Sequence, residues 1–262
     1  MTDAPQQRWS NLIQQGSFYE AEQLCTALHH RLFRAGKKQE ALECLLQGAR
    51  DLAKSEQFQC AIVLLEKAQE YMRKHYFSEE TLSQVATLLA SFPNTLKAKL
   101  TLGNKLERLA TEKRCSETIL HDLYKLEAET CVGMGDYRRA LSYYSILSDS
   151  QQYLLVLKEW MSQGLPSEED LFVTRQVLWL LLSQQKLQFA KQVLQQYLQQ
   201  YNNNHGKGGP LLNFVYLLLE CLERRLFSSV EYLKTIYKPA IDRDPHLWKL
   251  LQEAIEYRRK HS

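Results

Sequence analysis

Glycine and proline are scarce in this chain, whose 262 residues contain 10 glycines and 6 prolines. Together they fall well below the roughly 12% of residues that the two supply in an average protein. A sheet protein needs a turn about every ten residues, and disordered or linker segments are rich in both residues, so the shortage argues against these classes. Leucine and glutamine, which are good helix formers, dominate instead. The composition predicts an all-α protein.

Long apolar runs and a strong charge imbalance are also absent. The longest apolar stretch, residues 211–222, is interrupted by Asn213 and Glu220 and is far shorter than the about twenty residues that span a bilayer. The first residues show no basic and no apolar region of a signal peptide. A net charge of +3, from 33 basic and 30 acidic residues, is too small to indicate a nucleic-acid or membrane-surface partner. We expect a cytosolic protein with no nucleic-acid partner and no stable membrane insertion.

Residues with reactive side chains form no recognisable site. The six cysteines never stand as Cys-x-x-Cys and suit buried thiols of a reducing compartment better than a disulfide framework. His29 and His30 diverge by about 100° on a helix, so they cannot share one metal ion there. Gly206-Lys-Gly-Gly209 lacks the residue order of a phosphate-binding loop, and no Gly-x-Ser-x-Gly segment is present. We therefore expect a protein that is not an enzyme and that uses no metal and no cofactor.

Apolar residues recur at helical spacing along the whole chain. Residues 20–33 and 58–72 each place an apolar stripe on one face, whereas residues 171–182 are apolar on nearly every side, which is typical of a helix buried between neighbours. We count about fourteen helices, with residues 201–210 as a loop. Glycines are expected to end the stripes as helix caps, and these are Gly16, Gly36, Gly103, Gly135 and Gly164.

A six-residue turn pattern repeats beneath these helices. It runs from a turn residue, through an apolar or aliphatic-stemmed third residue, to an alanine. The copies end at Ala21, Ala41, Ala61, Ala140 and Ala190, and the first three alanines are twenty residues apart. Glycine lets the chain reverse, and alanine lets two helices approach closely. The pattern is typical of tetratricopeptide-like stacks and predicts one right-handed α-solenoid, residues 1–262, of about seven antiparallel helical hairpins.

Several short motifs occur in an order and at spacings that match those of a known family. They are Gly16-Ser-Phe-Tyr-Glu-Ala-Glu-Gln23 near the start, Asp170-Leu-Phe-Val173 further on, and Pro210-Leu-Leu-Asn-Phe214, Tyr237-Lys-Pro239 and Arg243-Asp-Pro245 near the end. In order and spacing they resemble the motifs of the Golgi-to-ER traffic protein four family, the α-solenoid scaffold of tail-anchored membrane-protein targeting. The resemblance covers nearly the whole chain.

The resemblance implies a scaffold that bridges a homodimeric targeting ATPase and a ubiquitin-like adaptor linked to an upstream chaperone. Residues 1–134 would face the ATPase, and residues 135–262 the adaptor. Carried over by position, the candidate ATPase contacts are Tyr19, Gln23 and Arg31, with Lys37 and Lys38 as helpers. The candidate adaptor contacts are Leu211, Leu212, Phe214 and Tyr237, of which the first three suit a purely structural core equally well.

Some positions depart from the family pattern. Where the family commonly has a histidine before the glutamine and a basic residue three places after it, this chain has Glu22 and Thr26. Positive charge is thus lost from the expected ATPase surface, and such charges chiefly set association rate and specificity. Residues 201–209 are short for the projecting hairpin with which fungal members clasp the adaptor, which leaves open a different adaptor or none.

Two other interpretations remain open from the residues alone. A different tetratricopeptide-like or lid-type scaffold predicts a concave groove that carries asparagine, lysine and arginine for a peptide carboxylate. An unrecognised hydrolase or transferase predicts a deep pocket with convergent polar groups and a titratable residue of perturbed pKa.

Overall fold

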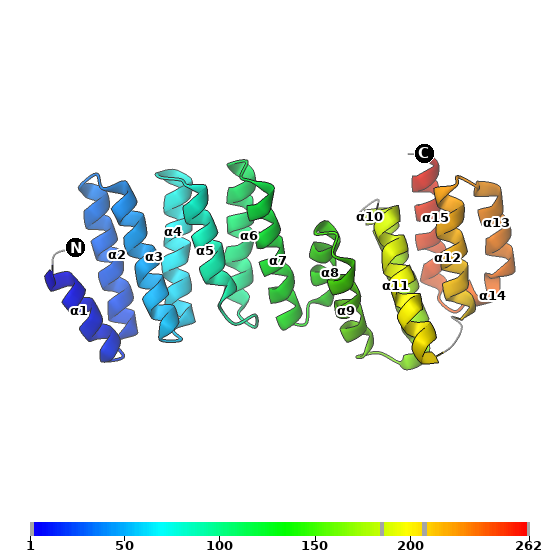
Figure 1. Ribbon diagram of the computed structural model, residues 1–262, viewed down its shortest axis with the longest axis horizontal. Coiled ribbons are helices and arrows are strands. Elements are labelled where there is room, and N and C mark those ends of the chain that lie inside the picture. The colour runs from blue at the N-terminus through cyan, green and yellow to red at the C-terminus, as the bar shows by residue number, and fades with distance from the viewer. Residues whose placement is uncertain (1–2, 184–185, 206–208, 261–262) are drawn as a thin grey trace. The chain divides into compact units, whose positions relative to one another are not determined.

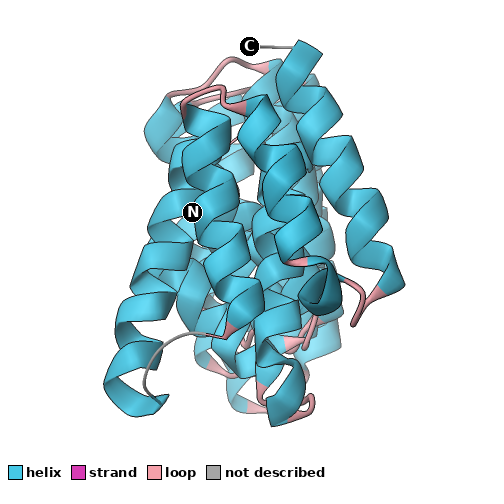
Figure 2. Cartoon of the chain, turned by 90° about the vertical axis from the view of Figure 1, so that its right-hand side faces the viewer, coloured by secondary structure: helices cyan, strands magenta, loops and turns pink. Residues whose placement is uncertain are grey.

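The computed structural model describes residues 3–183, 186–205 and 209–260, and all of them lie in helices or in the loops between helices (Figure 2). Within these ranges there are fifteen α-helices, one short 3₁₀ turn and no strand. The predicted all-α solenoid fold is confirmed. The chain divides into two compact units, Met1–Asp136 and Tyr137–Ser262, close to the expected division at 134/135. The assignment of one partner to each half stays a prediction.

Seven antiparallel helices make up the described part of unit 1 (Figure 1). They are α1 (Asp3–Gln14), α2 (Phe18–Arg34), α3 (Lys38–Lys54), α4 (Phe58–Lys74), α5 (Glu79–Ala90), α6 (Lys97–Glu112) and α7 (Glu117–Gly133). Besides packing on its neighbours in sequence, α4 packs on both α2 and α6, and α5 packs on α7. The unit therefore has two layers, with α2, α4 and α6 in one and α3, α5 and α7 in the other.

The repeated turn of the sequence is a helix C-cap with left-handed backbone. Gly16 and Gly36 adopt φ values of +73° and +77°, and Glu56 adopts +59° at the same place in the third copy. In each of these three copies the next residue donates its backbone N–H to a carbonyl five residues earlier, over 2.9–3.0 Å, which is the Schellman arrangement. The alanine that ends each of the five copies is fully buried, which agrees with the predicted close approach of helices: Ala21, Ala41, Ala61, Ala140 and Ala190 have no exposed surface.

Two of the five expected glycine caps are wrong. Gly103 lies inside α6, where a side chain would come within 3.1 Å of Leu126 and 3.3 Å of Glu127 on α7, so the residue allows close helix packing rather than a turn. Gly164 follows α9 without a left-handed backbone. The loop expected over 201–210 is also shorter than predicted, because α11 continues to His205 and α12 begins at Pro210; residues 206–208 lie outside the described residues.

The helices of unit 2 do not follow a simple stacking order. They are α8 (Tyr137–Ile146), α9 (Ser150–Met161), the 3₁₀ turn Pro166–Glu168, α10 (Glu169–Ser183), α11 (Leu187–His205), α12 (Pro210–Glu223), α13 (Phe227–Ile236), α14 (Lys238–Ile241) and α15 (Pro245–Lys260). The last helix, α15, returns to pack on α10, which also contacts α9, α11 and α12 (Figure 1). This central position explains why residues 171–182 are apolar on nearly every side.

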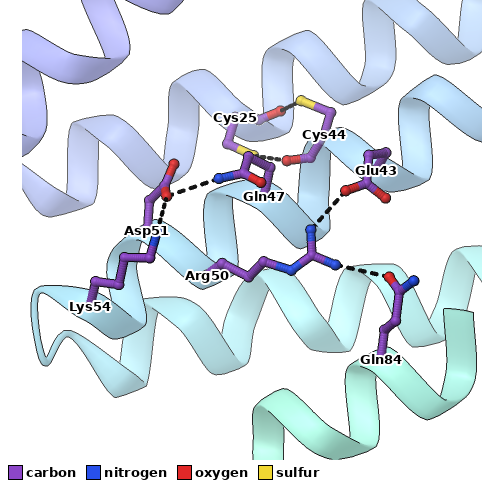
Figure 3. Close-up of polar contacts among 8 residues, drawn as sticks. All are labelled: Cys25, Glu43, Cys44, Gln47, Arg50, Asp51, Lys54 and Gln84. Carbon is purple, nitrogen blue, oxygen red and sulfur yellow. Dashed lines mark hydrogen bonds and ion pairs between the residues drawn. The ribbon is translucent and has the colours of Figure 1, made fainter.

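Polar contacts join three helices of unit 1 (Figure 3). The Arg50 guanidinium pairs with Glu43 at 2.7 Å and donates to Gln84 Oε1 at 2.8 Å, which ties α3 to α5. Nearby, the buried Cys25 thiol donates to the Cys44 carbonyl at 3.3 Å, which ties α2 to α3. All six cysteines are free thiols, and four are buried as expected, whereas Cys60 and Cys221 are only half-buried.

Candidate partner-binding surfaces

One face of α2 carries three of the predicted ATPase contacts. The helix turns Ala21, Cys25 and His29 into the core, so residues on the opposite side of the helix point to solvent. Tyr19 is 69% exposed, and the side chains of Gln23 and Arg31 are also exposed. A tyrosine ring that is this exposed contributes little to the stability of the fold. Exposed aromatic and arginine side chains are typical of protein interfaces.

The two predicted helpers lie where α3 begins. Lys37 precedes the helix and pairs with Glu40 at 2.9 Å, with both side chains more than half exposed. Lys38 is the first residue of α3, and its carbonyl accepts a hydrogen bond from the Tyr71 hydroxyl at 3.2 Å. The turn between α2 and α3 is thereby anchored to α4. Because an exposed pair such as Lys37–Glu40 is weak, a partner carboxylate can replace Glu40.

A lysine from α4 supplies positive charge beside the positions that lack it on α2. Lys67 Nζ donates to Thr26 Oγ1 at 2.8 Å and lies 3.4 Å from Glu22 Oε1. The Glu22 side chain is almost fully buried, whereas that of Lys67 is 35% exposed. Lys67 was not among the predicted contacts, because it lies 41 residues after Thr26 and only the packing of α2 on α4 brings the two together.

The adjacent histidines behave differently, as expected. His29 is buried, with Nδ1 3.0 Å from the Ala41 carbonyl and its ring edge-on to Tyr71 at 4.9 Å. Burial lowers the pKa of His29, so the ring is neutral near pH 7 and Nδ1 donates to the carbonyl. His30 is exposed. Within the described ranges, no three histidine, cysteine or acidic side chains come together in a way that could hold a metal ion.

Three of the four predicted adaptor contacts are core residues of unit 2. Leu211, Leu212 and Phe214 on α12 are at most 1% exposed. Tyr237 is half-buried, and its ring lies 5.6 Å from that of Phe214. Tyr237 also lines a groove of ≈ 580 Å³ together with Pro210, Ile236, Pro239, Ala240 and Arg243. The buried residues can therefore support a binding surface, but only Tyr237 reaches one.

Four large apolar side chains are exposed on α12 and α13, and one of them, Ile236, also lines this groove. They are Tyr216 (40% exposed), Leu217 (38%), Tyr232 (68%) and Ile236 (52%), and we call this set of side chains the α12–α13 patch. Only Val230 of α13 is buried, so this helix adds little to the core while presenting large apolar side chains to water. Exposed apolar side chains gathered on one surface are typical of protein interfaces. The sequence alone does not reveal these exposed side chains, because the same residue types at helical spacing are usually core.

Sequence motifs far apart in the chain meet in unit 2. Arg243 donates to Asp170 Oδ1 at 3.1 Å and to the Ser167 carbonyl at 2.9 Å. Its neighbour Asp244 pairs with Arg175 on α10 at 2.8 Å and accepts the backbone N–H of His246. The Arg-Asp-Pro motif therefore fastens the start of α15 to α10 and helps to position the Tyr237 groove, to which Arg243 also contributes.

Comparison with known proteins agrees with this arrangement. Curated relatives include Golgi to ER traffic protein 4 homologs from Dictyostelium discoideum (24% identical, over 91% of this chain and 77% of that protein) and Xenopus laevis (homolog A, 28%, over 89% and 73%). Protein GET4 of Arabidopsis thaliana is 24% identical over 94% of this chain and 86% of its own. The fold matches the crystal structure of C. therm. Get4 with a TM-score of 0.70 and 18% identity, over 91% of this chain and 82% of that one.

None of the described helices is both long and apolar enough to cross a membrane. The family model for Golgi to ER traffic protein 4 matches residues 35–256. The matched segment includes Lys37, Lys38 and the predicted adaptor contacts, whereas Tyr19, Gln23 and Arg31 precede it. Because the match covers most of the sequence, this chain belongs to the Golgi to ER traffic protein 4 family.

Proposed function

We propose that this protein is a non-enzymatic cytosolic scaffold for tail-anchored membrane proteins, which bridges the homodimeric targeting ATPase and a ubiquitin-like adaptor. Membership of the Golgi to ER traffic protein 4 family supports the pathway. The observation that carries the bridging role is that each unit has its own exposed surface of interface character: the α2 face in unit 1 and the α12–α13 patch in unit 2. Two such surfaces suit a protein that holds two different partners.

On the ATPase side, Tyr19 and Arg31 provide the residue types that dominate the energetics of protein interfaces. Lys37, Lys38 and the α4 residue Lys67 add positive charge around them, which would speed association with an acidic surface. A scaffold promotes one state of an enzyme only by binding that state more tightly. We therefore expect the ATPase to be held in its closed, nucleotide-bound form, ready to accept a tail-anchored substrate.

On the adaptor side, the α12–α13 patch would bind an apolar segment. Tyr232 and Ile236 project from a helix that is otherwise weakly anchored, and Phe214 supports the neighbouring Tyr237 from within the core. An amphipathic helix that places apolar residues every three or four positions fits such a surface, as in other helix-in-groove complexes. Leu211, Leu212 and Phe214 would act by holding the surface in place rather than by touching the adaptor.

Separate variants of the two surfaces test the proposal. Arg31→Glu and Tyr19→Ala are expected to weaken capture of the ATPase, and Tyr232→Ser with Ile236→Ser to weaken capture of the adaptor. Because all four side chains are exposed, the free energy of unfolding should change by no more than about 0.5 kcal/mol per substitution. Pull-down of each partner, with Lys125→Glu on α7 as a surface-charge control, measures the effects. Unchanged capture by every variant would reject the assigned surfaces.

A further inference from the structure

Two neighbouring grooves cross unit 1 on the layer formed by α2, α4 and α6. The larger, of ≈ 660 Å³, lies between α4 and α6, and the smaller, of ≈ 220 Å³, lies between α2 and α4. Lys67, Glu70 and Lys74 line both grooves. The two are therefore continuous across α4, and we call them together the charged trough. Of the residues that line the two grooves, the proposed bridging function uses only Lys67.

The acidic side chains of the trough are already engaged. The pairs are Glu66 with Lys105 at 2.6 Å, Glu70 with Lys74 at 2.5 Å, and Glu112 with Arg73 at 3.6 Å. Arg108 lies between Lys105 and Glu112 on α6, is exposed, and forms no ion pair with any described residue. Lys67 is held at the other side of the trough by Thr26 and Glu22. Positive charge on α4 and α6 thus remains available to a ligand.

The positions of these charged side chains indicate which class of ligand fits the trough. Lys67 on α4 and Arg108 on α6 line the same groove, and the axes of two packed helices such as these lie about 8–10 Å apart. Glu70 lies between them on α4 and would repel a ligand with negative charge at every position, such as a nucleic acid. An extended peptide advances about 3.3 Å per residue, so carboxylates three residues apart match one helix spacing and leave neutral residues over Glu70.

We propose that the charged trough binds an extended acidic peptide segment of a protein partner, with carboxylates three residues apart that pair with Lys67 and Arg108. The interaction is between solvent-exposed charges, so it weakens as ionic strength rises. Arg108 is the decisive contact because it forms no ion pair with any residue that the structure describes. Lys74 is paired with Glu70 and would contact the peptide only if that ion pair were broken.

A fluorescently labelled nine-residue peptide with glutamate at every third position tests the trough directly. Its binding to the full chain is measured by fluorescence anisotropy, with the same peptide carrying glutamine as the control. Arg108→Glu is expected to weaken binding about tenfold, since it reverses the charge of the free cation. Glu70→Gln should strengthen binding about threefold, because it releases Lys74 and removes the central carboxylate. Lys125→Glu, an equal charge change outside the trough, should leave affinity unchanged.

Several results would overturn the proposal. One is that the wild-type chain binds neither peptide. Another is that Lys125→Glu weakens binding as much as Arg108→Glu, which would indicate non-specific attraction. Tighter, Arg108-dependent binding of a heparin fragment would assign the trough to a polyanion instead. Arg108→Glu is expected to capture the ATPase normally, so failure of the peptide assay leaves the bridging function intact, whereas loss of ATPase capture would place the trough inside the ATPase surface.

Discussion

Asp244 pairs with Arg175 at 2.8 Å while its carboxylate also accepts the backbone N–H of His246 at 3.0 Å. One side chain thus caps the start of α15 and ties that helix to α10, 69 residues earlier in the chain. Asp244 is only 4% exposed. Burial by itself would raise the pKa of Asp244, but the His246 N–H and the Arg175 guanidinium lower it overall, so the carboxylate is ionised at neutral pH.

Removal of this carboxylate is expected to loosen the C-terminal helix. Asp244→Ala leaves Arg175 without its partner and the first turn of α15 without its cap, at a cost of about 2–4 kcal/mol in unfolding free energy. Glu70→Ala removes an exposed pair in unit 1 and should change stability by less than about 0.5 kcal/mol. Urea denaturation of both variants provides the comparison. Equal stability of the two would show that Asp244 does not hold α15.

A buried lysine predicts an unusual dependence of stability on pH. Lys99 on α6 is 1% exposed, and its ammonium donates to the Ala90 and Phe92 carbonyls and to Asn94 Oδ1 over 2.7–2.9 Å. Burial lowers the pKa of Lys99 to about 8, from 10.5. Between these pH values the unfolded chain binds the proton and the folded chain releases it, so the contribution of Lys99 to stability rises with pH.

Comparison with Lys99→Met isolates this contribution. The difference in unfolding free energy between the wild type and the variant should grow by about 1–2 kcal/mol from pH 7.5 to pH 9.5. Chemical denaturation across that range, followed by circular dichroism, measures the difference. A difference that stays constant with pH, or that shrinks, would mean that Lys99 keeps an ordinary pKa when folded.

Close packing of α2 on α3 depends on a glycine in the middle of a helix. A Cβ atom at Gly48 would lie 2.6 Å from Cys25 Sγ and 3.0 Å from Leu64 Cδ1. Alanine is favoured over glycine in a helix by about 1 kcal/mol, yet Gly48→Ala should lower unfolding stability by about 1–2 kcal/mol because the core is overpacked.

A second substitution tests the cause of that loss. Cys25→Ala removes the Sγ atom that the new methyl group would meet, so it should recover at least about 1 kcal/mol in the Gly48→Ala background. Denaturation of the wild type, both single variants and the double variant gives the coupling. Additive effects would show that the strain arises elsewhere, for example at Leu64.

Local patterns predicted the local structure well. The turn pattern that ends at Ala21, Ala41 and Ala61 predicted the helix caps and the close approach of helices at the alanines. Both features depend on residues that are adjacent in sequence. Gly103 was misassigned, since a glycine that ends a helix and one that lets two helices touch look alike in sequence. The return of α15 to α10 was also missed, because it depends on Arg175 and Asp244, which are far apart in the chain.

The candidate surfaces were predicted less completely than the fold. Exposure of Tyr19 and Arg31 agrees with their predicted role as ATPase contacts, which stays a prediction until partners are tested. Lys67 and the α12–α13 patch could not be found from sequence, because a surface is made by helices that pack side by side rather than by consecutive residues. Tyr232 and Ile236 recur at the spacing of a buried stripe, but they are exposed because none of the described helices covers them.

Simultaneous binding of both partners tests the bridging function most directly. The protein is mixed with the ATPase dimer in the presence of ATP and with the adaptor, and the complexes are sized by sedimentation velocity. Bridging predicts one species that contains all three proteins, reduced to the ATPase-free complex by Arg31→Glu and to the adaptor-free complex by Tyr232→Ser with Ile236→Ser. Partners that displace each other, or a chain that binds neither, would contradict the scaffold function.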